Sequence, residues 1–186
     1  MSQAVNSIWD VHTQNRILKL HPYIKEKAVR FILQAQALGI YLRITSGFRS
    51  LAEQQKLYDQ GRTAPGPIVT NARPGESFHN YGLAFDVVEI KGGAALWDNP
   101  RWHEIGQLGK SFGLYWGGDW TSWKDKPHFQ SHAGTAQEAA RKLNLSPGYA
   151  LPGADITTGG AVETLKPAAA ALGVTALGII IGLLMK

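Results

Sequence analysis

The chain has 186 residues, of which 44% are hydrophobic and 18% charged, a composition typical of one globular domain with room for an appendage. It contains no cysteine, which excludes a disulfide framework, a cysteine-ligated zinc site, an iron–sulfur cluster and a thiol nucleophile. Any metal ion must therefore be held by His, Asp and Glu. The formal net charge of +5 favours a polyanionic partner, such as nucleic acid, anionic lipid or the bacterial cell wall.

The positive charge is concentrated in the first part of the chain. Residues 146–186 carry two lysines and two acidic residues, so the whole excess lies in residues 1–145. The lysines and arginines are scattered and no nucleic-acid-binding motif occurs, so we expect no nucleic acid partner. The N-terminal residues lack the basic and apolar regions of a secretory signal, so we expect the chain to be made in the cytoplasm without one.

The first half of the chain predicts two helices with a strand between them. A helix over residues 21–39 is indicated by a proline that suits its first turn and a glycine that suits its left-handed end. Residues 40–45 alternate and are rich in branched side chains, which predicts a strand. Ser50 forms a capping box with the glutamate three residues later, and this opens a helix to residue 61. A loop rich in Gly and Pro continues to residue 76.

The second half predicts shorter elements. Residues 83–90 are a candidate for a buried strand, and an Asn-Pro pair opens a helix over residues 99–112. Short apolar segments follow at 114–116 and 127–129, and a second capping box at Thr135 opens a further helix. Helices and short strands alternate without a regular βαβ period. We therefore expect an α+β fold, with a small antiparallel sheet flanked by helices.

The C-terminal part of the chain differs in composition. Residues 146–166 are typical of a flexible linker. Residues 167–185 carry no charge, and as a helix of ~1.5 Å per residue they would nearly span a hydrocarbon core ~30 Å thick. We therefore predict a folded domain in residues 1–145, the linker, and a hydrophobic C-terminal helix in residues 167–186 that inserts into the bacterial membrane. A helix packed on the domain is the alternative.

The residues best suited to catalysis are concentrated in two runs. His79 and Asp86 belong to the run SFHNYGLAFD, which begins at Ser77, and His128 closes the run DKPH, which begins at Asp125. A catalytic zinc ion takes three protein ligands and keeps one position open for water. His79, Asp86 and His128 could supply two imidazoles and a carboxylate to one zinc ion, which would activate that water.

Two further residues fit such chemistry. Asp125 could take the proton of the attacking water and pass it to the leaving amine. Arg49, in the run SGFR, could hold the oxygen of the attacked carbonyl or a substrate carboxylate through its planar guanidinium. Asp119 is a rival acid, although a role in a turn is the simpler explanation. His132 is a rival ligand, because it stands four residues after His128.

Together these runs resemble the zinc D-Ala-D-Ala carboxypeptidase and L-Ala-D-Glu endopeptidase family of peptidoglycan enzymes. The family pattern is S-x-H-x-x-G-x-A-x-D, followed by an acid three residues before a second histidine, and the likeness extends over roughly residues 20–145. It is closest to the L-alanyl-D-glutamate endopeptidases of phage endolysins and wall hydrolases. The resemblance implies a zinc peptidase domain in residues 1–145, with Asp125 and Arg49 as catalytic residues.

The resemblance also implies a substrate and a place of action. The substrate would be the stem peptide of peptidoglycan, cut between L-Ala and D-Glu at the cell wall in lysis or remodelling, with membrane anchoring through the C-terminal helix. A D-Ala-D-Ala carboxypeptidase is the alternative. That branch usually has Glu before the last histidine, so Asp125 favours the endopeptidase.

Two interpretations from other functional classes, a binding protein and a membrane-acting protein, remain open. One is a catalytically silent zinc fold that binds the wall, against which the presence of both Asp125 and Arg49 argues. The other is a membrane-acting protein whose hydrophobic tail is the active part.

Residues near the two runs are candidates for binding substrate. Trp116 and Trp120 flank the proposed site and are expected to wall a substrate groove. Gln54 and Ser77 accompany the arginine and histidine motifs and are further candidate contacts. Trp97, by contrast, is expected in the core.

Overall fold

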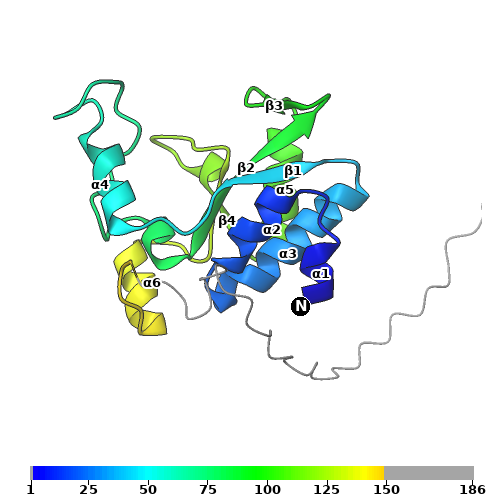
Figure 1. The fold of residues 1–186 in the computed structure, drawn as a ribbon, viewed down its shortest axis with the longest axis horizontal. Helices are drawn as coiled ribbons and strands as arrows, with labels where there is room; N and C mark the ends of the chain where they lie inside the picture. The colour runs from blue at the N-terminus through cyan, green and yellow to red at the C-terminus, as the bar shows by residue number, and fades with distance from the viewer. Residues whose placement is uncertain (1, 149–186) are drawn as a thin grey trace, which may run out of the picture. The chain divides into compact units, whose positions relative to one another are not determined.

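The computed structural model describes residues 2–148, which fold around a small antiparallel sheet (Figure 1). The strand order is β1-β2-β5-β4, and β3 pairs with the C-terminal end of β2. The predicted α+β fold with a small antiparallel sheet is therefore confirmed. The strands are β1 (Leu42–Ser46), β2 (Ala84–Lys91), β3 (Ala94–Leu96), β4 (Tyr115–Trp116) and β5 (His128–Gln130).

Helices α2, α3 and α5 lie together beside the sheet (Figure 1). The chain leads from β1 away from these helices to α4, and α6 lies on the same side of the picture as α4. The helices are α1 (Ser2–Asn6), α2 (Val11–Leu18), α3 (Pro22–Ala37), α4 (Leu51–Asp59), α5 (Trp102–Ser111) and α6 (Ala136–Leu143), with 3-10 turns η1 (Phe78–Tyr81) and η2 (Gly117–Asp119).

Successive side chains of β2 point to opposite faces of the sheet. Phe85 and Val87 are fully buried in the main hydrophobic cluster, and the ring of Phe85 packs against Phe129 of β5 and Phe31 of α3. Asp86 lies between them in sequence and therefore points to the other face. The helical layer thus covers one face of the sheet, and Asp86 lies on the opposite face between the buried residues Ala84 and Val88.

The strand register places three polar residues in one row. Asp86 of β2 pairs with Ser46 on one side and with His128 on the other. A bulge in β1 lies between Ile44 and Ser46, and it is this extra residue that brings Ser46 opposite Asp86. In a regular pairing Thr45 would occupy that position. The bulge therefore decides which side chain of β1 reaches the row.

Most of the helices and strands predicted from the sequence are present with slightly shifted ends. The helix expected over residues 21–39 is α3, and Gly39 beyond it has a φ of +72°. Both capping boxes, at Ser50 and Thr135, are formed in the structure. The short helices before residue 20 and the hairpin strand β3 were not predicted.

Two expectations around α5 are wrong. The helix begins at Trp102 rather than at Asn99, because the Asn99 side chain accepts a hydrogen bond from the backbone N–H of Arg101 and donates one to Glu89. Trp97 does not lie in the core, since 58% of it is exposed. Its carbonyl oxygen accepts a hydrogen bond from the indole N–H of Trp102 at 3.0 Å.

The predicted linker (146–166) lies outside the described residues except for its first three positions, and the predicted C-terminal helix (167–186) lies outside them entirely. Within residues 2–148, no helix has both the length and the apolar character that a membrane crossing requires.

Asp10 joins the N-terminal helices to the sheet. Its carboxylate caps α2 by accepting hydrogen bonds from the backbone N–H and the hydroxyl of Thr13, at 2.9 and 2.7 Å. Arg43 of β1 donates to both carboxylate oxygens, at 3.2 and 3.0 Å. The Thr13 hydroxyl also accepts from the backbone N–H of Ile44. Burial alone would raise the pKa of the Asp10 carboxyl, but these hydrogen bonds lower it.

Replacing Asp10 with Ala is expected to lower the free energy of unfolding by about 2–4 kcal/mol, because a helix cap and charge-assisted hydrogen bonds are lost. Since the folded-state pKa is lowered, this contribution is present above the unfolded pKa of about 3.9 and is lost as the pH falls through the folded-state value. Denaturant titrations of both proteins should therefore differ more near neutral pH than in acid. Equal stabilities at neutral pH would contradict this role of Asp10.

Candidate metal centre

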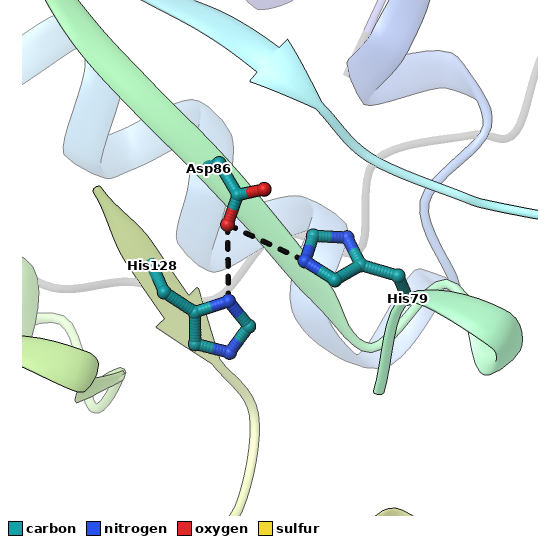
Figure 2. A group of neighbouring side chains, drawn as sticks. All are labelled: His79, Asp86 and His128. Carbon is teal, nitrogen blue, oxygen red and sulfur yellow. Dashed lines mark hydrogen bonds and ion pairs between the residues drawn. The ribbon is translucent and has the colours of Figure 1, made fainter. Parts of the chain in front are cut away.

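His79, Asp86 and His128 meet on the face of the sheet opposite the helical layer (Figure 2). Oδ1 of Asp86 lies 3.3 Å from Nε2 of His79 and 3.0 Å from Nδ1 of His128. All three potential ligand atoms lie within 4.8 Å of one another, and both imidazoles are buried. The structure thus brings together the three residues that the sequence motifs singled out.

The backbone fixes which nitrogen of His79 faces the cluster. Nδ1 of His79 lies 2.7 Å from the carbonyl oxygen of Gly47. A carbonyl only accepts, so Nδ1 must carry the hydrogen. In the neutral ring, Nε2 then has a free lone pair, and it is Nε2 that faces Asp86.

The side chain of Gln130 fixes which nitrogen of His128 faces the cluster. Nε2 of His128 lies 3.1 Å from Oε1 of Gln130, and the amide nitrogen of Gln130 donates to the carbonyl oxygen of His132 at 2.6 Å. This second bond orients the amide, so that its oxygen accepts from His128. Nδ1 of His128 therefore presents its lone pair to Asp86.

With both rings neutral, three electron-pair donors face one another, and a metal cation between them would satisfy all three. Two neutral imidazoles and one carboxylate form a donor set that suits zinc, and acceptors that hold the outer N–H of each ring are typical of metal-ligating histidines. Burial alone would raise the pKa of the Asp86 carboxyl, but without a metal ion the charge and the hydrogen bonds of protonated His79 and His128 lower it well below its usual range. Asp86 is therefore an anion, ready to bind a metal ion.

The turn that carries His79 is defined at both ends. Ser77 begins η1, and its hydroxyl oxygen accepts a hydrogen bond from the backbone N–H of His79 at 3.3 Å. Gly82 ends the turn with a φ of +64°, and a Cβ there would lie 3.1 Å from the backbone nitrogen of His21. Glycine is needed because both the conformation and the close contact disfavour a side chain. The chain then enters β2, which carries Asp86.

Arg49 lies beside the cluster and is held by neutral acceptors. It donates to the hydroxyl of Ser46 and to the side-chain oxygen of Gln54, both at 3.0 Å, and it lies 3.9 Å from Oδ2 of Asp86. Gln54 is completely buried, and its amide nitrogen donates to the carbonyl oxygen of Ala72. Gln54 therefore lies behind Arg49, where it orients the guanidinium and fixes the loop before η1.

Asp125 and Ser77 border the same cavity as the cluster, a hollow of about 300 Å³. The backbone of Asp125 is tied to its surroundings, because its N–H donates to Gly117 and its carbonyl accepts from the N–H of His128. A Cβ on Gly117 would lie only 2.5 Å from that carbonyl, so the two segments approach closely. Burial raises the pKa of the Asp125 carboxyl, and the nearby charge of Asp86 raises it further.

The two candidate groove tryptophans have different surroundings. Trp116 is buried in the main hydrophobic cluster, with its indole N–H bonded to the carbonyl oxygen of Lys126, although it also borders a hollow of about 580 Å³. Trp120 is 39% exposed, and its ring centroid lies 5.2 Å from that of His128. It also borders a hollow of about 250 Å³, together with Trp123 and Asp125. Trp120, rather than Trp116, is thus the open aromatic surface beside the cluster.

The rival residues lie elsewhere. Asp119 forms an ion pair with Lys110 at 2.6 Å and does not border the 300 Å³ cavity. The ring of His132 stacks on Tyr23 at 4.8 Å. Sequence reasoning missed Gln130, and the signal that could have found it is the spacing of two residues from His128, which places both side chains on one face of a strand.

Comparisons with known proteins agree with this geometry. A family model described as VanY, D-alanyl-D-alanine carboxypeptidase, matches residues 17–130. The peptidoglycan L-alanyl-D-glutamate endopeptidase CwlK of Bacillus subtilis (strain 168) is 43% identical over 135 residues, which are 64% of this chain and 81% of that protein. The L-alanyl-D-glutamate peptidase of Listeria phage A118 is 26% identical over 144 residues, which are 75% of this chain and 48% of the phage protein.

A solved structure of VanYB in complex with D-alanine-D-alanine has a TM-score of 0.50 and 20% identity, over 68% of this chain and 78% of that one. At this identity the likeness shows a shared fold.

Replacing Gln130 with Leu is expected to weaken zinc binding about 10- to 100-fold, because the outer N–H of His128 loses the acceptor that orients the ring. Competition with a chromogenic chelator measures the affinity. His103→Ala, on the exposed surface of α5, is the matched control and should bind zinc like the parent. His79→Ala should lose tight binding altogether, and one tightly held zinc ion in that variant would refute the ligand set.

Proposed function

Since the chain belongs to the VanY family of D-alanyl-D-alanine carboxypeptidases, we propose that it is a zinc-dependent peptidoglycan peptidase that cuts the stem peptide between L-Ala and D-Glu. The observation that carries the proposal is the cluster of His79, Asp86 and His128 in one cavity with Asp125 and Arg49. The 43% identity to a named L-alanyl-D-glutamate endopeptidase supports the choice of bond.

His79, Asp86 and His128 would hold one zinc ion, which when bound supplies a Lewis acid and lowers the pKa of a water molecule towards ~7. The chain prepares these ligands before the ion binds. Gly47 and Gln130 hold the two rings so that little rearrangement is needed.

Asp125 is suited to move the proton of the attacking water. It borders the cavity that contains the cluster, and its backbone bonds to Gly117 and His128 fix its position. Since burial raises its pKa, the carboxylate is a stronger base than an exposed aspartate. We propose that Asp125 accepts the proton of the water and delivers it to the leaving amine, which frees the new N-terminus.

Arg49 is suited to stabilise the oxygen of the attacked carbonyl. Ser46 and Gln54 hold its guanidinium through neutral acceptors, so that of the described carboxylates only Asp86, at 3.9 Å, forms an ion pair with it. A fixed, planar cation at the edge of the cavity favours the negative charge that develops on this oxygen. Ser77 and Trp120 are proposed to contact the peptide on either side.

A second candidate function is a D-Ala-D-Ala carboxypeptidase, which the description of the matching family favours. The two activities give different products. Mass spectrometry of purified peptidoglycan after digestion should show fragments with a new N-terminal D-Glu, whereas released D-Ala without such fragments would support the carboxypeptidase. No cleavage at all would contradict both.

Asp125→Asn should lower turnover about 100-fold or more, because a positioned proton acceptor is replaced by a group that cannot accept the proton. The same chelator titration should show that zinc is still bound, since Asp125 is not among the proposed ligands. Asp119→Asn serves as the control and should keep the parent activity. Normal turnover of the Asp125→Asn enzyme would move the role to another group.

We further propose that the catalytic domain occupies residues 1–145 and is joined by the linker 146–166 to a hydrophobic helix that associates with a bacterial membrane. The uncharged run 167–185, between Lys166 and Lys186, supports this proposal. The full chain should be recovered with membranes after cell fractionation, and residues 1–160 should not. Equal partition of the two proteins into the soluble fraction would contradict the membrane role.

A further inference from the structure

A second cavity adjoins the metal cavity on the other side of Arg49. It measures about 530 Å³, and both Arg49 and Leu57 border the two cavities. Arg16 and Lys19, at the end of α2, and Lys56, in the last turn of α4, also line it. We call this hollow, with its four cationic residues, the basic cavity.

Neighbouring acids neutralise only part of the positive charge of the basic cavity, because Asp86 lies 3.9 Å from Arg49 and Glu53 lies near Arg49 and Lys19. Glu53 is the acidic residue in its wall, and one oxygen of Glu53 already accepts hydrogen bonds from the backbone N–H and the hydroxyl of Ser50, at 2.8 and 2.7 Å. Within the described part of the chain, Arg16, Lys19 and Lys56 form no ion pair. The cavity therefore suits an anionic group.

Helix dipoles explain part of this arrangement but not all of it. Basic side chains are favourable near the C-terminal end of a helix, and this accounts for the sign of charge at the ends of α2 and α4. It does not account for the fact that two helices distant in sequence end at one hollow, or that this hollow shares Arg49 with the metal cavity. A ligand that reaches from one cavity into the other accounts for both.

The proposed substrate carries a negative charge next to the bond that is cut. A glutamyl residue has two carboxyl groups, and only one of them forms the bond to the next residue of the peptide. The other remains a free carboxylate on the residue directly after the scissile bond. We propose that the basic cavity binds this free carboxylate of the D-glutamyl residue, with Lys19 and Lys56 as specificity-determining residues.

This inference rests on the proposed function and adds that the enzyme selects its substrate by the free carboxylate of the D-glutamyl residue. Amidation of the free carboxyl group converts the residue to an uncharged amide of nearly the same size. The enzyme should therefore cut a stem peptide with D-Glu about tenfold more efficiently than the amidated peptide, the scale expected for one ionic contact with partly exposed lysines. The difference should appear mainly in KM, because the contact exists in both the bound substrate and the transition state.

The test compares these two synthetic peptides with the full-length enzyme and two double variants. Lys19→Gln/Lys56→Gln removes two charges from the basic cavity, whereas Lys91→Gln/Lys142→Gln removes two exposed charges elsewhere. The first variant should cut both peptides with similar kcat/KM, at most about twofold apart, and the second should keep the preference of the parent. Raised salt should reduce the preference of the parent as well.

The possible failures are distinguishable. Equal cleavage of the two peptides by the parent enzyme would overturn the carboxylate assignment alone, as would a preference that survives in Lys19→Gln/Lys56→Gln. If that variant keeps the preference but no longer binds walls that carry phosphate polymers, the cavity binds the polymer instead, and the proposal is overturned. An enzyme that cuts neither peptide would contradict the proposed function, and the carboxylate assignment would fall with it.

Discussion

The carboxylate of Asp86 is the group on which the rest of the site depends. It lies on the face of β2 opposite the helical layer, within 3.3 Å of both histidines and 3.9 Å of Arg49. Its position follows from the core on the other face, because Phe85 and Val87 on either side of it are fully buried. A slip of one residue in β2 would bury Asp86 and expose the two apolar side chains. The hydrophobic layer therefore fixes the register, and through the register it fixes the site.

The same constraint explains how residues far apart in sequence meet. Antiparallel pairing brings Ser46 and His128 to either side of Asp86, and the bulge in β1 selects Ser46 instead of Thr45. Ser46 then accepts a hydrogen bond from Arg49, so the arginine is placed by the same row that places the metal ligands. One sheet thus orients both the proposed metal ligands and the arginine beside them.

Short sequence patterns predicted those features of the fold that depend on residues close together in the chain, such as the ends of helices. The capping boxes at Ser50 and Thr135 and the left-handed residue Gly39 mark ends of helices, and each depends on residues within one turn. The spacing of histidine and aspartate in one run indicated two members of the cluster. Resemblance to a family contributed the link between the two runs, which spacing alone leaves open.

The features that were missed depend on pairing between distant segments. Gln130 orients His128 because both lie on β5, and the spacing of two residues indicates one face only once this short segment is known to be a strand paired with β2. The sequence suggests Gln54 as a substrate contact, because it accompanies Arg49 in sequence. Its direction follows from the packing of α4, which buries it behind the arginine. Sequence proximity shows that two residues are neighbours, but not which of them faces the cavity.

Part of the chain's excess positive charge lies beside the metal cluster. The excess of +5 lies in residues 1–145, and part of it lines a cavity next to the metal cluster. Protonated lysine and arginine have no lone pair for a metal ion, so they can attract an anionic substrate but do not themselves bind the ion. At physiological ionic strength, the interaction between exposed charges more than about 8 Å apart is largely screened. The basic residues therefore act mainly on a group inside the cavity, and the proposed carboxylate contact would turn the general affinity of a basic protein for a polyanionic wall into a local preference beside the bond to be cut.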